Sequence, residues 1–177
     1  MTQMKYIRVV PGVEIGLLEK PCAGDKERFC RLFGETWRQI PSEDREALTD
    51  YWCSYPDTSR PCYTELETGL LVCLNRGELP AGHGAAAVAY ENSHEIAFLG
   101  PYMDSVPDHI VKAIIAHELA HIRLRIDNPT HLGRSVEERK AAEQDANGLG
   151  DDWGFECTSA SHWHQAHIDL WQNCVTK

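Results

Sequence analysis

The sequence has few of the features that suit a nucleic-acid partner. It contains 17 basic residues against 27 acidic ones, its formal net charge is −10, and no run of Lys or Arg is longer than two. Because phosphate binding needs clustered cations, we expect no nucleic-acid-binding surface. An acidic surface favours a protein or peptide partner instead, including a basic regulatory protein.

Long apolar runs are also missing. No uncharged apolar segment approaches the roughly 20 residues that a membrane-spanning helix requires, so no membrane association is expected. The N-terminal residues MTQMKYIRVV lack the apolar stretch of a signal peptide. The seven cysteines are scattered and include no CxxC pair, which is unlike a disulfide framework. These features predict reduced thiols in a cytoplasmic protein. A Cys53–Cys62 pair is the alternative if the chain were exported.

The order of apolar and polar residues predicts a single α+β domain over 1–177. Short strands are expected over 5–19, 62–66, 69–74, 85–90 and 95–99, separated by Gly, Asn and Pro. Helices are expected over 24–40, 42–52, from Pro107 to Asp127, from Ser135 to Gly154 and over 160–174. This punctuation favours a small, mostly antiparallel sheet. Residues 1–90 contain no motif that indicates their role.

The helix expected after Pro107 contains an HExxH pattern from His117 to His121. Residues four apart lie on one face of a helix, so both imidazoles can bind one metal ion. Glu118 is turned by about 100° from His117. It therefore suits the role of a general base that takes a proton from a water activated by the metal. Such a short pattern also arises by chance, which leaves open a helix with two ordinary histidines.

A third ligand is available on the next expected helix. Catalytic zinc commonly has three protein ligands and one open position. Glu143 can supply the third ligand, and Asn147, four residues later, can accept a hydrogen bond from the distal ring nitrogen of a ligand histidine. The alternatives for this ligand are His131, in the loop between the helices, and Glu137 or Glu138, which are more typical of a helix cap.

HELAH followed by EQDAN resembles the gluzincin metallopeptidases, and most closely the ExEAN form of the ImmA/IrrE-like metallopeptidases. The resemblance covers residues 95–155. It implies a minimal zincin-like metallopeptidase domain, with a small sheet packed on the HExxH helix and one Zn²⁺ per chain. It implies the following roles: ligands His117, His121 and Glu143, general base Glu118, and a partner of a ligand histidine at Asn147.

The resemblance also implies that Glu95–Leu99 is an edge strand that pairs with an extended substrate. This sequence differs from that family in two respects. Gly148 and Gly150 interrupt the apolar run of the second helix, and no DNA-binding or sensor domain is evident. The metzincin pattern HExxHxxGxxH does not fit, because Leu124 and Asp127 stand at the positions of its glycine and third histidine.

These patterns predict a zinc-dependent peptidase that hydrolyses a peptide bond. The alternative from another class is a non-catalytic, zinc-stabilised regulatory or protein-binding module on the same fold. The presence of Glu118 favours catalysis, because a structural site has no need of a base. The candidates for contacts with the oxyanion or the substrate are His131, His164, His167 and Tyr102.

Overall fold

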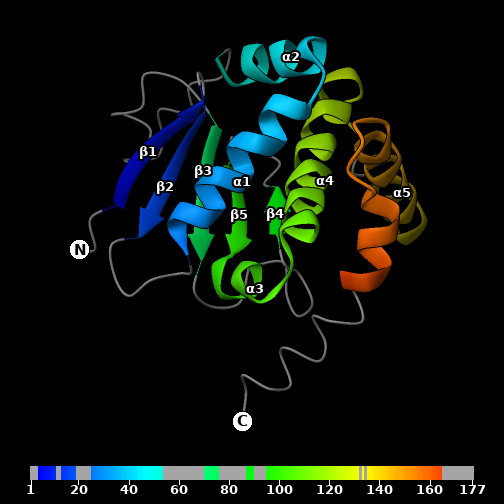
Figure 1. Ribbon diagram of the computed structural model, residues 1–177. Coiled ribbons are helices and arrows are strands. Elements are labelled where there is room, and N and C mark those ends of the chain that lie inside the picture. Colours follow the sequence, from blue (N-terminus) through cyan, green and yellow to red (C-terminus); the bar gives the residue numbers. More distant parts are fainter. Residues whose placement is uncertain are drawn as a thin grey trace.

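The structure of the protein is a computed structural model with strands on one side and helices on the other (Figure 1). It describes residues 4–10, 13–18, 25–53, 70–75, 87–89, 95–131, 133 and 135–164. The strands are β1 (Met4–Val10), β2 (Val13–Leu18), β3 (Leu70–Asn75), β4 (Ala87–Ala89) and β5 (Glu95–Leu99). The helices are α1 (Lys26–Gln39), α2 (Ser42–Cys53), α3 (Gly100–Ser105), α4 (Asp108–Asp127) and α5 (Val136–Asp152). A further helical segment covers 157–164.

The five strands form a mixed sheet in the order β1-β2-β3-β5-β4. The outer pairs, β1 with β2 and β4 with β5, are antiparallel. The inner pairs, β2 with β3 and β3 with β5, are parallel. Parallel neighbours cannot be joined by a tight hairpin. The chain accordingly passes through α1 and α2 between β2 and β3.

The predicted fold class, an α+β domain with a small and mostly antiparallel sheet packed on the HExxH helix, is wrong. The described residues are mainly helical, and the central pairings of the sheet are parallel. The prediction interpreted Gly, Asn and Pro between apolar runs as hairpin turns. The amphipathic helix expected over 24–40, between two strand regions, was the overlooked sign of a crossover connection.

The expected edge strand is also wrong. Glu95–Leu99 is β5, which pairs with β3 on one side and with β4 on the other. The strand at this end of the described sheet is β4, and it lies next to α4 (Figure 1). Helices α1, α2, α4 and α5 lie where the periodicity predicted them, whereas α3 was not predicted. The strand expected over 62–66 lies outside the described residues.

Helix α1 forms because its ends and its apolar face are both well specified. The Asp25 side chain accepts a hydrogen bond from the backbone N–H of Arg28 at 2.9 Å and so caps the first turn. Apolar residues at steps of three and four, including Phe29, Leu32 and Phe33, are buried. The ring centroid of Phe29 lies 5.1 Å from that of Phe98 in β5, so this face packs on the sheet.

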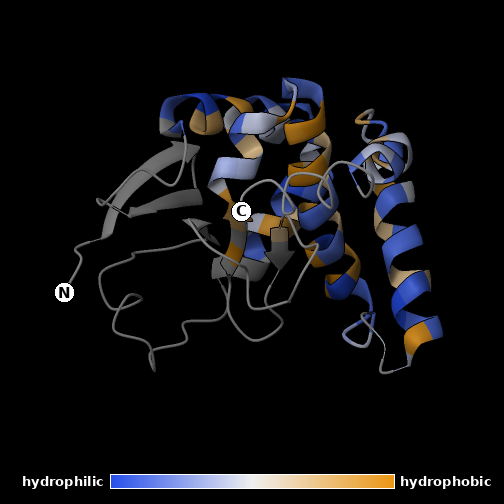
Figure 2. Ribbon diagram, turned by 90° about the horizontal axis from the view of Figure 1, so that it is seen from below, coloured by the Kyte–Doolittle hydropathy of each residue, from blue (hydrophilic) through white to orange (hydrophobic). Residues whose placement is uncertain are grey.

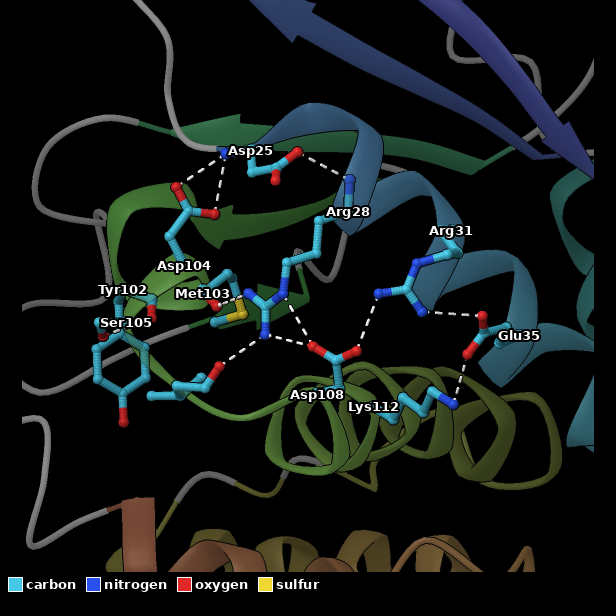
Figure 3. A network of polar contacts seen from close by, with 11 residues as sticks. Asp25, Arg28, Arg31, Glu35, Tyr102, Met103, Asp104, Ser105, Asp108 and Lys112 are labelled. Carbon is cyan, nitrogen blue, oxygen red and sulfur yellow. Dashed lines mark hydrogen bonds and ion pairs between the residues drawn. The ribbon is translucent and has the colours of Figure 1, made fainter.

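A network of charges attaches α1 to the start of α4 (Figure 3). The Arg28 guanidinium donates to the backbone oxygens of Met103 and Val106 at 2.6 and 2.7 Å, and to the Asp108 carboxylate at 2.7 Å. Arg31 donates to the other oxygen of Asp108 at 2.9 Å. The two guanidinium groups hold the pKa of Asp108 below its usual range. These contacts fix the turn from which α4 starts.

Helix α4 is the central element of the structure. Its 20 residues correspond to a length of about 30 Å. Residues from Ile110 to Ile122 are buried on most sides of the helix, so it lies within the core rather than on the surface. Glu118 and His121 are among the few buried polar residues of the described chain. Buried polar groups are costly unless they have partners or a function.

Helix α5 packs against α4 through small residues. Its first turn is fixed by a capping box between Ser135 and Glu138. Ala142, Ala146 and Gly150, at steps of four, are its buried residues. A Cβ atom at Gly150 would collide with the Sγ of Cys157. The glycines in this helix therefore do not interrupt it, and one of them is required by the packing.

The end of α5 is also well defined. Gly154 has a φ of +87°, a conformation that favours glycine. The backbone N–H of Phe155 donates to the oxygen of Gly150 at 3.1 Å, and that of Gly154 donates to Asp151 at 2.8 Å. This Schellman arrangement satisfies the last carbonyl groups of the helix. Figure 2 shows α5 with hydrophilic residues along most of its length, in keeping with one exposed side. Of the described helices, none has the length and apolar character of a membrane span.

Replacing Ala146 by leucine should separate α4 from α5. Ala146 is 0% exposed, so three added heavy atoms have no space, and we expect a loss of about 1–3 kcal/mol in the free energy of unfolding. Ala141→Leu, on the exposed side of the same helix, should change stability by less than about 0.5 kcal/mol. Urea unfolding of both variants measures the difference. Equal stabilities would contradict the packing described here.

Candidate metal centre

Helices α4 and α5 bring together two histidines and one glutamate. His117 and His121 lie one turn apart on α4, and Glu143 faces them from α5. The Nε2 of His117 lies 3.1 Å from Glu143 Oε2 and 3.1 Å from the Nε2 of His121. The Nε2 of His121 lies 3.4 Å from Glu143 Oε1. Three side chains that can bind a metal thus converge on one point.

The spacing of these atoms fits a tetrahedral zinc ion. With Zn–N and Zn–O bonds of about 2.0–2.1 Å, neighbouring ligand atoms of a tetrahedron are about 3.3 Å apart. The two ring nitrogens are 3.1 Å apart, and each lies 3.1–3.4 Å from a different oxygen of the Glu143 carboxylate, so the separations are close to this value. Two ring nitrogens and one carboxylate leave the fourth position open. The side chain of His121 is 6% exposed and that of Glu143 is 59% exposed, so the group is open to solvent on the side of α5.

The electrostatics of the group follow from this proximity. Burial alone would lower the pKa of His117, but the hydrogen bond with Glu143 and the negative charges of Glu118 and Glu143 raise it overall. Burial works in the opposite direction on Glu143, whose pKa the two histidines nevertheless hold far below its usual range. The carboxylate is therefore ionised at neutral pH, as a metal ligand must be.

Asn147 fixes the orientation of His117. Its side-chain oxygen lies 2.9 Å from the Nδ1 of His117. An amide oxygen only accepts hydrogen bonds, so Nδ1 carries the proton. Nε2 is then the ring nitrogen that faces His121 and Glu143. This is the contact that the sequence pattern suggested for a partner of a ligand histidine.

Glu118 lies beside this group and is 8% exposed. Its negative charge is near enough to raise the pKa of His117. A buried carboxylate is retained where it has partners or a function. The role of Glu118 as a general base stays a prediction from the HExxH pattern.

His131 lies beside His121 rather than in the group of three. Its ring centroid is 5.8 Å from that of His121, with the ring planes at 49°. Burial and the neighbouring His121 lower the pKa of His131. The group whose ligand atoms all lie within 4.8 Å of one another comprises His117, His121 and Glu143. Neither Glu137 nor Glu138 belongs to this group, and Glu138 forms the capping box at the start of α5.

Tyr102 and His164 form a pair with each other. The Tyr102 hydroxyl lies 2.7 Å from the Nδ1 of His164, and the ring centroids are 5.2 Å apart. Burial raises the pKa of Tyr102 above its usual range. The pair joins α3 to the helical segment 157–164, and neither residue belongs to the group of three. The predicted contact residue His167 lies outside the described residues.

A separate pocket lies at the other end of α4. Its volume is about 390 Å³, and its lining includes Gln39, His109, Lys112, Phe155 and Trp163. No residue of the metal-candidate group lines it. Sequence reasoning missed this pocket because its walls come from α1, from α4 and from the chain after α5, and no local pattern connects the three.

Comparisons of the chain with protein-family models, with curated proteins and with solved structures gave no match. The resemblance to the gluzincin metallopeptidases thus stays a prediction from the sequence motifs.

Removing the amide of Asn147 should weaken zinc binding without unfolding the protein. Loss of a hydrogen-bond partner of a ligand histidine typically reduces metal affinity about 10–100-fold, and we expect Asn147→Leu to fall in this range. Asn147→Asp, which keeps an acceptor, should bind at least as tightly as wild type. Gln144→Leu, on the exposed side of α5, is the matched control. Titration calorimetry with Zn²⁺ measures the affinities, and an unchanged Asn147→Leu would exclude this role.

Proposed function

We propose that the protein is a zinc-dependent peptidase. His117, His121 and Glu143 bind one Zn²⁺ per chain, and Glu118 is the general base. The observation that supports this most strongly is the convergence of the three candidate ligands at separations of 3.1–3.4 Å. Next to them is a buried carboxylate that no structural metal site would need.

The chemistry follows from the properties of these residues. Bound zinc would act as a Lewis acid that polarises the substrate carbonyl and lowers the pKa of a water molecule. Glu118 removes a proton from a water molecule as the oxygen of that water attacks the peptide carbonyl carbon, and it gives the proton to the amine nitrogen when the C–N bond breaks.

The substrate that suits this site is an extended segment of a protein or peptide. Strand β4 is the last strand of the described sheet on the side of α4 (Figure 1). A backbone at such an edge can pair with an extended chain and present it to the neighbouring helix. The net charge of −10 favours substrates with basic residues, such as a basic regulatory protein.

The rival function is a non-catalytic module that zinc stabilises. Structural zinc sites usually fill all four positions, often with cysteine. In the described part of the chain, the metal-candidate group has three members and none is a cysteine. The thiols of Cys30 and Cys157 are free. We therefore favour catalysis, and we propose the cytoplasm as its location because a reducing compartment keeps thiols free.

Replacing Glu118 by glutamine should separate binding from catalysis. The amide cannot accept a proton from water, so we expect turnover to fall by at least about 10²–10⁴-fold. Zinc content should stay at one ion per chain, because Glu118 is not a ligand. Asp145→Asn, which removes an exposed charge from α5, is the control and should keep both. Cleavage of a fluorogenic mixed-peptide library measures turnover, and full activity of Glu118→Gln would refute the mechanism.

Replacing Glu143 by alanine should remove the metal. Elemental analysis of wild type should give one zinc per chain, and Glu143→Ala should contain much less. Glu137→Ala removes an exposed acidic residue from the same helix and should keep the ion. A chelator should abolish activity while the protein stays folded, whereas a structural site would unfold. Absence of zinc from carefully prepared wild type would exclude the proposed function.

A further inference from the structure

Two neighbouring histidines each have a buried ring nitrogen without a hydrogen-bond partner in the described part of the chain. These atoms are the Nδ1 of His121 and the Nε2 of His131. The rings are neighbours, with centroids 5.8 Å apart. An unpaired buried polar group costs about 1–3 kcal/mol. Two such groups on adjacent rings, one able to donate and the other able to accept, can satisfy each other.

The proposed metal site explains why His121 needs a hydrogen-bond partner at its second ring nitrogen. The Nε2 of His121 is directed at His117 and Glu143, so Nδ1 is its distal nitrogen. A histidine that binds a metal almost always donates its distal N–H to a fixed acceptor, which sets its tautomer and ring orientation. Asn147 is the acceptor in this position for His117. The Nδ1 of His121 has no such acceptor among its direct contacts in the described residues.

We infer that His131 is the positioning residue of His121, with its Nε2 accepting a hydrogen bond from the Nδ1–H of His121. This inference rests on the proposed function, in which the Nε2 of His121 binds zinc. The two nitrogens do not bond directly to each other in the structure, because neither has a partner among the described residues and the ring centroids are 5.8 Å apart. A small rotation of His131, or one buried water molecule, closes this gap.

The connection between α4 and α5 is built to keep His131 in place. The backbone N–H of His131 donates to the oxygen of Asn128 at 2.9 Å, and that of Gly133 donates to the oxygen of Thr130 at 2.9 Å. The Asn128 side chain accepts from the hydroxyl of Thr130 at 2.8 Å. Gly133 has a φ of +61°, and a Cβ there would collide with Glu138. Successive turns thus fix the backbone from which the His131 side chain extends.

Two substitutions of His131 test the role. His131→Leu removes the acceptor and should weaken Zn²⁺ binding about 10–100-fold, while His131→Gln offers an amide oxygen and should recover most of the affinity. Competition with a chromophoric chelator at fixed pH measures both. His162→Leu, an exposed histidine of the segment 157–164, is the matched control. Thermal unfolding of the metal-free proteins shows how much stability each change removes.

A spectroscopic measurement separates positioning from a general structural role. In zinc-loaded wild type, long-range ¹⁵N–¹H spectra should show His121 protonated at Nδ1 and His131 unprotonated at Nε2. The Nδ1 proton of His121 should exchange with solvent faster in His131→Leu and return toward the wild-type rate in His131→Gln. A purely structural role would change the unfolding temperature without this pattern. Protonation of His131 at Nε2 in wild type would overturn the inference, and this result needs no variant.

The outcomes distinguish this inference from the proposed function. If wild type binds one zinc and His131→Leu binds it equally tightly, the inference fails and the metal site stands. Wild type without zinc removes the metal site, and the inference with it. A third outcome also overturns the positioning role. If His131→Gln binds Zn²⁺ as weakly as His131→Leu, and the visible spectrum of Co²⁺-loaded wild type differs from that of Co²⁺-loaded His131→Leu, then His131 is itself a ligand.

Discussion

The close packing of α5 on α4 is the constraint on which the candidate site depends. Ala142, Ala146 and Gly150 allow the two helix axes to approach, because none has a side chain larger than a methyl group. Glu143 and Asn147 each follow one of these alanines by one position, which turns them toward the rim of the interface. There they contact the histidines of α4. A bulky residue on the buried stripe would move both away together, so packing and chemistry in this region have the same determinants.

The long helix α4 can hold its histidines still because other elements fix both of its ends. Arg28 and Arg31 attach its first residue to α1 (Figure 3). Near its other end, Arg123 donates to Asp44 of α2 at 2.7 Å, and Asp44 also accepts from the Trp153 indole after α5 at 2.8 Å. A metal site requires ligands whose geometry is set before the ion arrives, and such partly buried charged contacts provide this order.

The sequence predicted local features well and non-local ones poorly. The spacing of His117 and His121 predicted that they share one face of a helix, because helical periodicity is encoded within a few residues. The place of Glu143 beside them was expected from the resemblance to the gluzincin metallopeptidases, not from periodicity. Strand order was not predictable in the same way. Whether Glu95–Leu99 pairs on one side or two depends on where β3 and β4 lie, and Gly, Asn and Pro between strands do not determine this. The pairing of Tyr102 with His164, 62 residues apart, likewise had no local signal.

The burial of Glu118 distinguishes the two functions considered for this fold in physical terms. Glu118 is only 8% exposed, and a buried carboxylate is retained where it has partners or a function. Under the proposed function, zinc held by His117 and His121 lies beside Glu118, and the buried carboxylate has a use in catalysis. A module that only needs zinc for its stability has no such use for this residue, so the burial of Glu118 fits the peptidase proposal better than the rival one.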